Sequence, residues 1–206
     1  MIRTAALLAS AAVIVGIGVS VGVILLRPDS DDRFADCGRG QVAGGTASIG
    51  GPFELTAADG RRVTDTEAIT RPTLVYFGYG FCPDICPTDL SRNALAAEEL
   101  AAQGIDVGQV FITIDPDRDT PEAVGAFTGA IDPGILGLTG SAEEIARAAA
   151  AYKVFYRKAG DDPYYLMDHS TFTYLMAPGE GLLEFYGSDV SAEAVASSAA
   201  CFARAL

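Results

Sequence analysis

The chain has 206 residues and a net charge of −13, with 27 acidic side chains against 14 lysines and arginines. Because proteins bind nucleic acids through clusters of basic side chains, this composition argues against nucleic acid as a partner. About 170 residues follow an apolar N-terminal segment, which is the size of a single domain.

The N-terminal segment predicts a membrane anchor. Residues 4–26 contain no charged side chain, and a helix of this length spans about 34 Å, enough to cross a hydrocarbon core of about 30 Å. A cleaved signal peptide would have a shorter apolar region and a clear cleavage site. Arg3 before the segment and acidic residues after it favour a cytoplasmic N-terminus. We therefore expect an anchor at 1–27, a linker at 28–49 and a domain at 50–206.

The expected location is a bacterial inner membrane, crossed once, with the C-terminal domain in the periplasm. No arginine- and serine-rich presequence precedes the predicted anchor, which favours this membrane over a mitochondrial one. Cys37 and Cys201 lie at opposite ends of the domain, and the two ends of a domain are often close together. In an oxidising compartment we expect these two residues to form a structural disulfide.

Strands and helices alternate along the domain. Apolar runs bounded by turn residues predict the strands, and Ser or Thr followed by Pro or Glu predicts helix starts. This alternation predicts an α/β fold with a mainly parallel sheet, of the thioredoxin-like type with an N-terminal β-hairpin. In chain order we expect a hairpin of 53–56 and 61–64, a strand at 73–78, a helix at 87–103 closed by Gly104, a strand at 110–114, a helix from Pro121, a strand at 135–139, a helix from Ser141 to about Tyr152, strands at 172–176 and 182–186, and a helix from Ser191.

The loop after the strand at 73–78 contains two cysteines, Cys82 and Cys86, each followed by a proline. A following proline disfavours helical geometry, so we expect both cysteines to be extended and Pro87 to open the next helix. Cys86 would then be the N-cap, where the helix dipole favours a thiolate. Two such sulfurs predict either a redox pair or a site for a thiophilic metal.

His169 is the only histidine, and it ends a polar and aromatic loop at 157–169. In a thioredoxin-like fold this loop faces the one that carries the cysteines. Two thiolates and one imidazole suit copper, as Cu(I) or Cu(II), and zinc would accept the same set with a fourth ligand. We therefore expect Cys82, Cys86 and His169 to be metal ligands.

Two carboxylates are candidates for supporting such a site. Asp115 follows the strand at 110–114 and either lies near the metal or contacts a partner, or else serves a turn and helix start beside Arg118. Asp168 either orients His169, as carboxylates beside metal ligands do, or is a solvated loop residue.

Three ordered motifs resemble the Sco/SenC proteins. They are Gly-Tyr-Gly-Phe-Cys-Pro-Asp-Ile-Cys-Pro at 78–87, Ile-Asp-Pro-Asp-Arg-Asp-Thr-Pro at 114–121, and Asp-His-Ser at 168–170 with Tyr-Leu-Met-Ala-Pro beyond it. The resemblance spans about residues 50–205 and includes the anchor. It departs from the family pattern at Gly80, where a threonine is common.

The resemblance implies a membrane-anchored, thioredoxin-like copper chaperone for cytochrome c oxidase. It implies that Cys82, Cys86 and His169 bind copper for the dinuclear copper centre of oxidase subunit II. It also implies a dithiol role, in which the cysteine pair reduces the cysteines of that subunit. The expected partners are subunit II, a periplasmic copper donor and a thiol reductant.

Two other functions stay open on the sequence. A periplasmic thiol–disulfide oxidoreductase would use Cys82 and Cys86 as its redox pair without needing copper. A copper or redox sensor would use the same residues for signalling. A peroxidase would need a lone cysteine of low pKa with an arginine nearby, which the paired cysteines do not suggest.

Overall fold

The computed structural model describes residues 33–38, 49–160 and 162–206, and Asp36–Leu206 form one compact unit. The predicted anchor at 1–27 lies outside the described residues, as does most of the predicted linker. Within the described ranges, no helix combines the length and the apolar character that a bilayer crossing requires.

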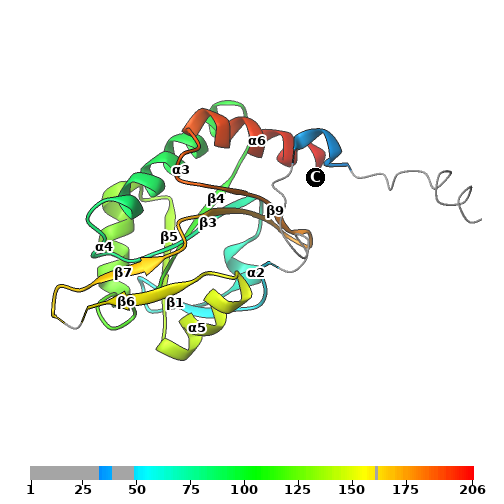
Figure 1. The fold of residues 1–206 in the computed structure, drawn as a ribbon. Coiled ribbons are helices and arrows are strands. Elements are labelled where there is room, and N and C mark those ends of the chain that lie inside the picture. The colour runs from blue at the N-terminus through cyan, green and yellow to red at the C-terminus, as the bar shows by residue number, and fades with distance from the viewer. Residues whose placement is uncertain (1–32, 39–48, 161) are drawn as a thin grey trace, which may run out of the picture. The chain divides into compact units, whose positions relative to one another are not determined.

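The secondary structure follows the predicted order, with several additions (Figure 1). The first half contains the 3-10 turn η1 (Ala35–Cys37), strands β1 (Glu54–Ala57) and β2 (Arg62–Thr64), helix α2 (Asp65–Ala68), strand β3 (Thr73–Gly78), helix α3 (Ile85–Ala102) and strand β4 (Gly108–Thr113). The second half contains α4 (Pro121–Ile131), β5 (Ile135–Thr139), α5 (Ala142–Ala151), β6 (Tyr156–Ala159), β7 (Leu166–His169), β8 (Thr173–Ala177), β9 (Gly181–Tyr186) and α6 (Ala192–Ala205).

Seven strands form one sheet in the order β2-β1-β5-β4-β3-β8-β9. The central strands β5, β4 and β3 are parallel, whereas β8, β9, β1 and β2 pair antiparallel at the two sides. The predicted α/β class and the mainly parallel centre are confirmed. The carboxyl ends of β3 and β4 lie together, since the Ile114 N–H donates to the Gly78 carbonyl at 2.8 Å. The two loops that leave these strands are therefore neighbours.

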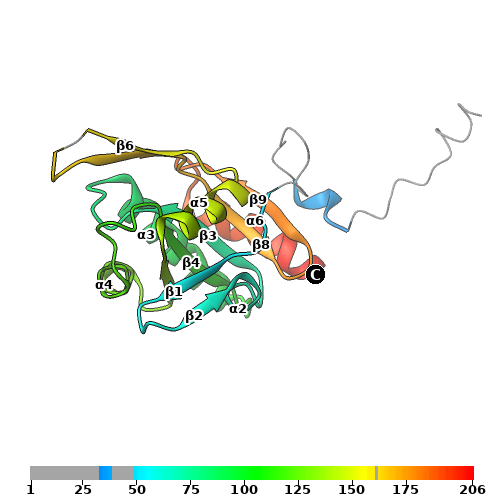
Figure 2. The same ribbon diagram turned by 90° about the horizontal axis from the view of Figure 1, so that it is seen from below.

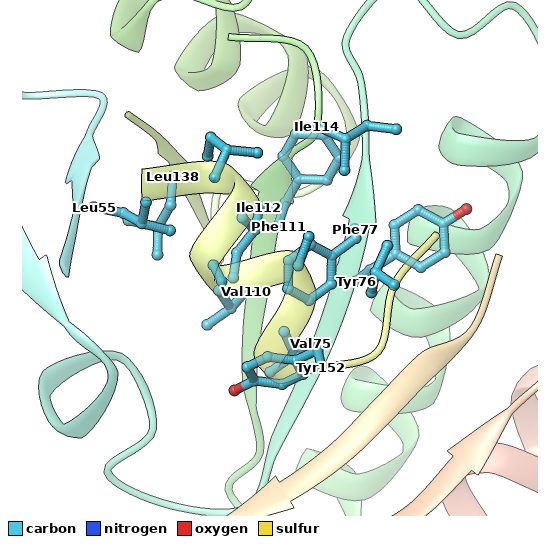
Figure 3. Close-up of a cluster of buried hydrophobic side chains, with 14 of the residues drawn as sticks. Leu55, Val75, Tyr76, Phe77, Val110, Phe111, Ile112, Ile114, Leu138 and Tyr152 are labelled. Carbon is cyan, nitrogen blue, oxygen red and sulfur yellow. The ribbon is translucent and has the colours of Figure 1, made fainter. Parts of the chain in front are cut away.

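The two central strands are covered on both faces, because every residue of β3 and β4 is buried. Side chains alternate between the faces of a strand. Phe77 packs against Tyr152 at the end of α5, with ring centroids 5.1 Å apart, and both are labelled in Figure 3. Phe111 packs against Phe127 of α4 at 5.3 Å. This core fixes the strand ends from which the cysteine loop departs.

The segment 157–168, for which the sequence predicts a loop, contains an antiparallel hairpin of β6 and β7 that forms a separate two-stranded sheet. The hairpin extends beyond the main sheet in both views (Figure 1 and Figure 2). Its strands contain exposed and partly buried residues but no fully buried one, and the apolar–polar alternation that predicts strands is missing from their sequences. His169, the last residue of β7, is therefore carried by a strand.

Helix α5 begins with the predicted capping box. The Ser141 side chain accepts from the Glu144 N–H at 3.3 Å, and the Glu144 carboxylate accepts from the Ser141 N–H at 2.8 Å. The same carboxylate pairs with Arg62 of β2 at 2.5 Å. The Arg62 guanidinium, followed by the Ser141 N–H, lowers the pKa of Glu144 from 4.5 to about 2. This pair connects the N-terminal hairpin to α5.

We expect Glu144→Gln to lower the free energy of unfolding at pH 7 by less than about 1 kcal/mol, because solvent screens a partly exposed pair. The folded-state pKa is depressed, so the stabilisation is present above pH 4.5 and disappears as the pH falls toward 2. Denaturant unfolding of both proteins between pH 7 and 2.5 measures the difference. Glu143→Gln is the control for the loss of a charge in the same helical turn. If the difference in unfolding free energy between the wild-type protein and Glu144→Gln stayed constant down to pH 2.5, the ion pair would not be its source.

Cys37 and Cys201 form a disulfide, the pairing expected from the sequence, with sulfurs 2.02 Å apart. It joins η1 to α6 across a sequence separation of 164 residues. A crosslink between such distant residues restricts the unfolded chain strongly.

We expect the double variant Cys37→Ser with Cys201→Ser to lose about 2–4 kcal/mol of unfolding free energy, because the unfolded chain regains its freedom. Urea unfolding under non-reducing conditions measures this loss. Wild-type protein treated with a reductant is the control and should unfold at the same denaturant concentration as the variant. A variant as stable as the oxidised wild-type protein would contradict the expectation.

Candidate metal centre

The cysteine loop connects the end of β3 to the start of α3. Helix α3 begins at Ile85 with Asp84 as its N-cap, so the prediction that Cys86 is the N-cap is wrong. Cys86 is the second helical residue, and its N–H donates to Cys82 Sγ at 3.4 Å. The sulfur thus satisfies one of the unpaired N–H groups of the first turn, and Pro87 has none to satisfy. These contacts outweigh the tendency of a proline to keep the preceding residue extended.

Both cysteines are free thiols, and both are buried. A hydrogen bond from Cys86 lowers the pKa of Cys82 from 9 to about 3, with the backbone N–H groups of Asp84 and Cys86 adding to the effect and burial opposing it. The same hydrogen bond, followed by burial, raises the pKa of Cys86. The two cysteines are therefore unequal, and Cys82 is the more acidic of the pair.

His169 brings its ring to the two sulfurs from the hairpin. Its Nε2 atom lies 3.5 Å from Cys86 Sγ, and its Nδ1 atom lies 2.8 Å from the Ser170 carbonyl oxygen. Because a carbonyl only accepts, the proton is on Nδ1 and the lone pair of Nε2 faces the sulfurs. The ring also meets Tyr76 and Tyr79 edge to face, with interplanar angles of 87°.

The ligand atoms of Cys82, Cys86 and His169 all lie within 4.8 Å of one another. The structure thus brings together the three residues that the sequence analysis singles out. Two sulfurs and an imidazole nitrogen with a free lone pair form a soft donor set, which fits a thiophilic ion.

Comparison with known proteins identifies the family. A family model described as SCO1/SenC matches residues 41–204. The chain belongs to the SCO1/SenC family. It is 50% identical over 206 residues to the protein SenC of Rhodobacter capsulatus, covering 99% of this chain and 92% of that protein.

Solved structures of Sco proteins share the fold. ScoI of Arabidopsis thaliana with copper bound is 39% identical, with a TM-score of 0.73 over 77% of this chain and 99% of that one. ScoI of Bradyrhizobium japonicum with copper bound is 36% identical, with a TM-score of 0.67 over 73% and 97% of the two chains. The predicted thioredoxin-like Sco fold is confirmed by these neighbours.

Asp168 does not orient His169 in this SCO1/SenC chain. Its carboxylate pairs with Arg157 across the hairpin at 2.6 Å, while the Ser170 carbonyl holds the histidine ring. Successive side chains of a strand point to opposite faces, which separates the carboxylate from the imidazole beside it.

Asp115 is buried, and it is not part of the group formed by Cys82, Cys86 and His169. One carboxylate oxygen accepts from the Tyr165 hydroxyl at 2.7 Å, and the other accepts from Arg118 Nε at 2.5 Å. Burial, followed by this hydrogen bond, raises the pKa of Tyr165 to about 12, so its hydroxyl remains a donor at neutral pH. The described contacts of Asp115 therefore reach the hairpin that carries His169.

Asp119 was not singled out from the sequence, although it holds the cysteine loop. Its buried carboxylate accepts from the Gly80 N–H at 2.9 Å and from the Thr113 hydroxyl at 2.5 Å. Burial raises the pKa of Asp119, and these two hydrogen bonds oppose the rise. A Cβ atom at Gly80 would lie 3.0 Å from an Asp119 oxygen, so the glycine allows close approach. The only sequence feature that points to Asp119 is its place in the motif at 114–121.

Proposed function

We propose that this chain binds one copper ion through Cys82 Sγ, Cys86 Sγ and His169 Nε2 and transfers it to subunit II of cytochrome c oxidase. The observation that carries the proposal is the convergence of these three atoms within 4.8 Å. Copper-bound structures of two Sco relatives support copper over other thiophilic ions. Copper is cargo here, so the protein must both bind and release it.

The site has features that suit a carrier. The cysteine sulfurs are buried, whereas His169 is only partly buried and sits at the end of an exposed hairpin. Two thiolates provide a site for Cu(I), and the imidazole adds the nitrogen donor that favours Cu(II). We infer that an incoming protein reaches the ion from the side of the hairpin.

We further propose that the domain at 50–206 works in the periplasm, held by an anchor at 1–27 and a linker at 28–49. The uncharged stretch at 4–26 is long enough for the anchor. The disulfide between Cys37 and Cys201 also favours an oxidising compartment. The partners would be the dinuclear copper centre of subunit II, a periplasmic copper donor and a thiol reductant.

A second function, reduction of a disulfide in subunit II, is favoured by the unequal cysteine pair. The Cys82 thiolate would attack one sulfur of the substrate disulfide, forming a mixed disulfide and releasing the other substrate sulfur as a thiolate. Cys86, after losing its proton, would then attack Cys82 Sγ and release the second substrate sulfur. Two thiols of this chain are oxidised to a disulfide while two substrate sulfurs are reduced. An oxidoreductase or a redox sensor would use the same pair.

Copper titration of the full-length protein tests the primary proposal. Reduced protein should bind about one copper ion per chain, and protein with a Cys82–Cys86 disulfide should bind none, because metal binding requires free thiolates. Cys86→Ser should bind the ion much more weakly, whereas Cys37→Ser with Cys201→Ser should keep the wild-type affinity. If oxidised and reduced proteins bound copper equally, the proposal would be wrong. Turnover of a protein disulfide without copper would favour the oxidoreductase.

A further inference from the structure

The segment between β4 and α4 contacts both loops that carry the proposed ligands. At one end, Asp119 accepts a hydrogen bond from Gly80 at 2.9 Å, two residues before Cys82. At the other end, Asp115 accepts one from Tyr165 at 2.7 Å, four residues before His169. One short segment is thus bonded to the cysteine loop and to the histidine hairpin.

The side chain of Arg118 contacts aromatic rings of both loops. Its guanidinium carbon lies 3.6 Å from the ring centroid of Tyr165 in the hairpin and 4.8 Å from that of Phe81 in the cysteine loop, with Tyr79 at 5.8 Å. Such distances are typical of cation–π contacts. The ion pair with Asp115 fixes the orientation of the guanidinium.

The guanidinium is held by these rings rather than by further hydrogen bonds. Both Nη atoms of Arg118 are buried and have no hydrogen-bond partner among the described residues. Burying unpaired donors costs free energy, which the ion pair with Asp115 and the contacts with the rings must offset. A lysine could not stack on two rings in the same way.

The hairpin needs such an attachment. It pairs with no strand of the main sheet among the described residues, and an isolated two-stranded hairpin is marginally stable in water. Half of its strand residues are exposed and the others are partly buried, whereas Tyr165, just before β7, is 7% exposed. Tyr156 and Met167 also pack against the core, but among the described residues of the hairpin Tyr165 is the one that is fully buried.

We propose that Asp115, Arg118 and Tyr165 form a clasp that fixes the position of His169 relative to Cys82 and Cys86. They are positioning residues, and none of them is a metal ligand. Their role rests on the proposed copper site. Since the imidazole is the donor that favours Cu(II), the clasp should affect the affinity for Cu(II) more than that for Cu(I).

Tyr165→Phe in the full-length protein tests the clasp, because it removes the hydroxyl and keeps the ring over Arg118. In metal-free protein, amides of β6 and β7 should exchange about 10-fold faster, the effect of one lost hydrogen bond to a charged group, while amides of β3 and β4 stay protected. Cu(II) affinity should fall about 10-fold or more, the usual effect of removing a group that orients a ligand. Cu(I) affinity should fall less, because the two thiolates are unchanged.

Tyr164→Phe is the matched control, since it removes the hydroxyl of the adjacent, 76% exposed tyrosine. Arg118→Lys, which keeps the charge and loses the planar stacking, should behave like Tyr165→Phe. Equal hairpin exchange and equal Cu(II) affinity in Tyr165→Phe and Tyr164→Phe would overturn the clasp and leave the copper site standing. Wild-type protein that bound no copper would instead overturn the proposed function, and with it the role of the clasp in metal binding.

Discussion

Replacing His169 with alanine should weaken Cu(II) binding by on the order of 100-fold or more, beyond the 10–100-fold typical for groups that only orient a ligand. The variant loses the lone pair of Nε2, which faces the sulfurs because Nδ1 donates to the Ser170 carbonyl. Cu(I) binding should be largely retained, since the two thiolates are unchanged.

The fold should tolerate this substitution, because His169 is partly exposed at the end of a hairpin outside the main sheet. We expect the melting temperature to change by no more than about 2–4 °C, the effect of about 1 kcal/mol. Competition titration with each oxidation state measures the affinities. Asp168→Asn is the control, since its carboxylate pairs with Arg157. Unchanged Cu(II) affinity in His169→Ala would exclude the histidine as a ligand.

Replacing Gly78 with alanine should damage both stability and the metal site. Gly78 ends β3, and a Cβ atom there would lie 2.9 Å from Tyr76 Cε1, 3.0 Å from Cys86 Sγ and 3.1 Å from Phe111 Cε2. All three neighbours are buried, so none can move without disturbing the core. Overpacking of this kind costs about 1–3 kcal/mol, and relief of the contact displaces the Cys86 sulfur.

Denaturant unfolding and copper titration of Gly78→Ala measure the two effects. Gly129→Ala is the control, because that glycine is exposed in α4 and a Cβ atom there would meet nothing within 4 Å. It should raise stability by about 0.5–1 kcal/mol and leave copper binding unchanged. A Gly78→Ala variant as stable as the wild-type protein would show that the core around Cys86 has room that the structure does not contain.

The sequence predicts the main sheet well, because buried strands require runs of apolar residues, and these runs are visible in the sequence. The strand at 73–78 matches β3 at both ends, and the starts of α4 and α5 follow from Thr120 with Pro121 and from Ser141 with Glu144. Gly104, expected to close α3, has the positive φ of 76° that such a position requires.

The sequence does not reveal the features that depend on contacts between distant residues. The sequences of β6 and β7, Tyr-Arg-Lys-Ala and Leu-Met-Asp-His, lack the apolar–polar alternation of a half-buried strand. Cys86 lies inside α3 because the Cys82 sulfur accepts its N–H, a bond that no local propensity describes. The partners of Asp119 and Arg118, Gly80 and Tyr165, lie 39 and 47 residues away in the chain. Local patterns therefore find the three ligand candidates and Asp115, but not the contacts of Arg118, Asp119 and Tyr165 that hold the two loops.

X-ray absorption at the copper edge, recorded on reduced full-length protein loaded with one equivalent of Cu(II), tests the proposed copper site most directly. We expect two sulfur ligands and one nitrogen ligand, with one sulfur lost in Cys82→Ser or Cys86→Ser and the nitrogen lost in His169→Ala. A ligand shell without sulfur, or one that these three substitutions leave unchanged, would contradict copper binding at this site.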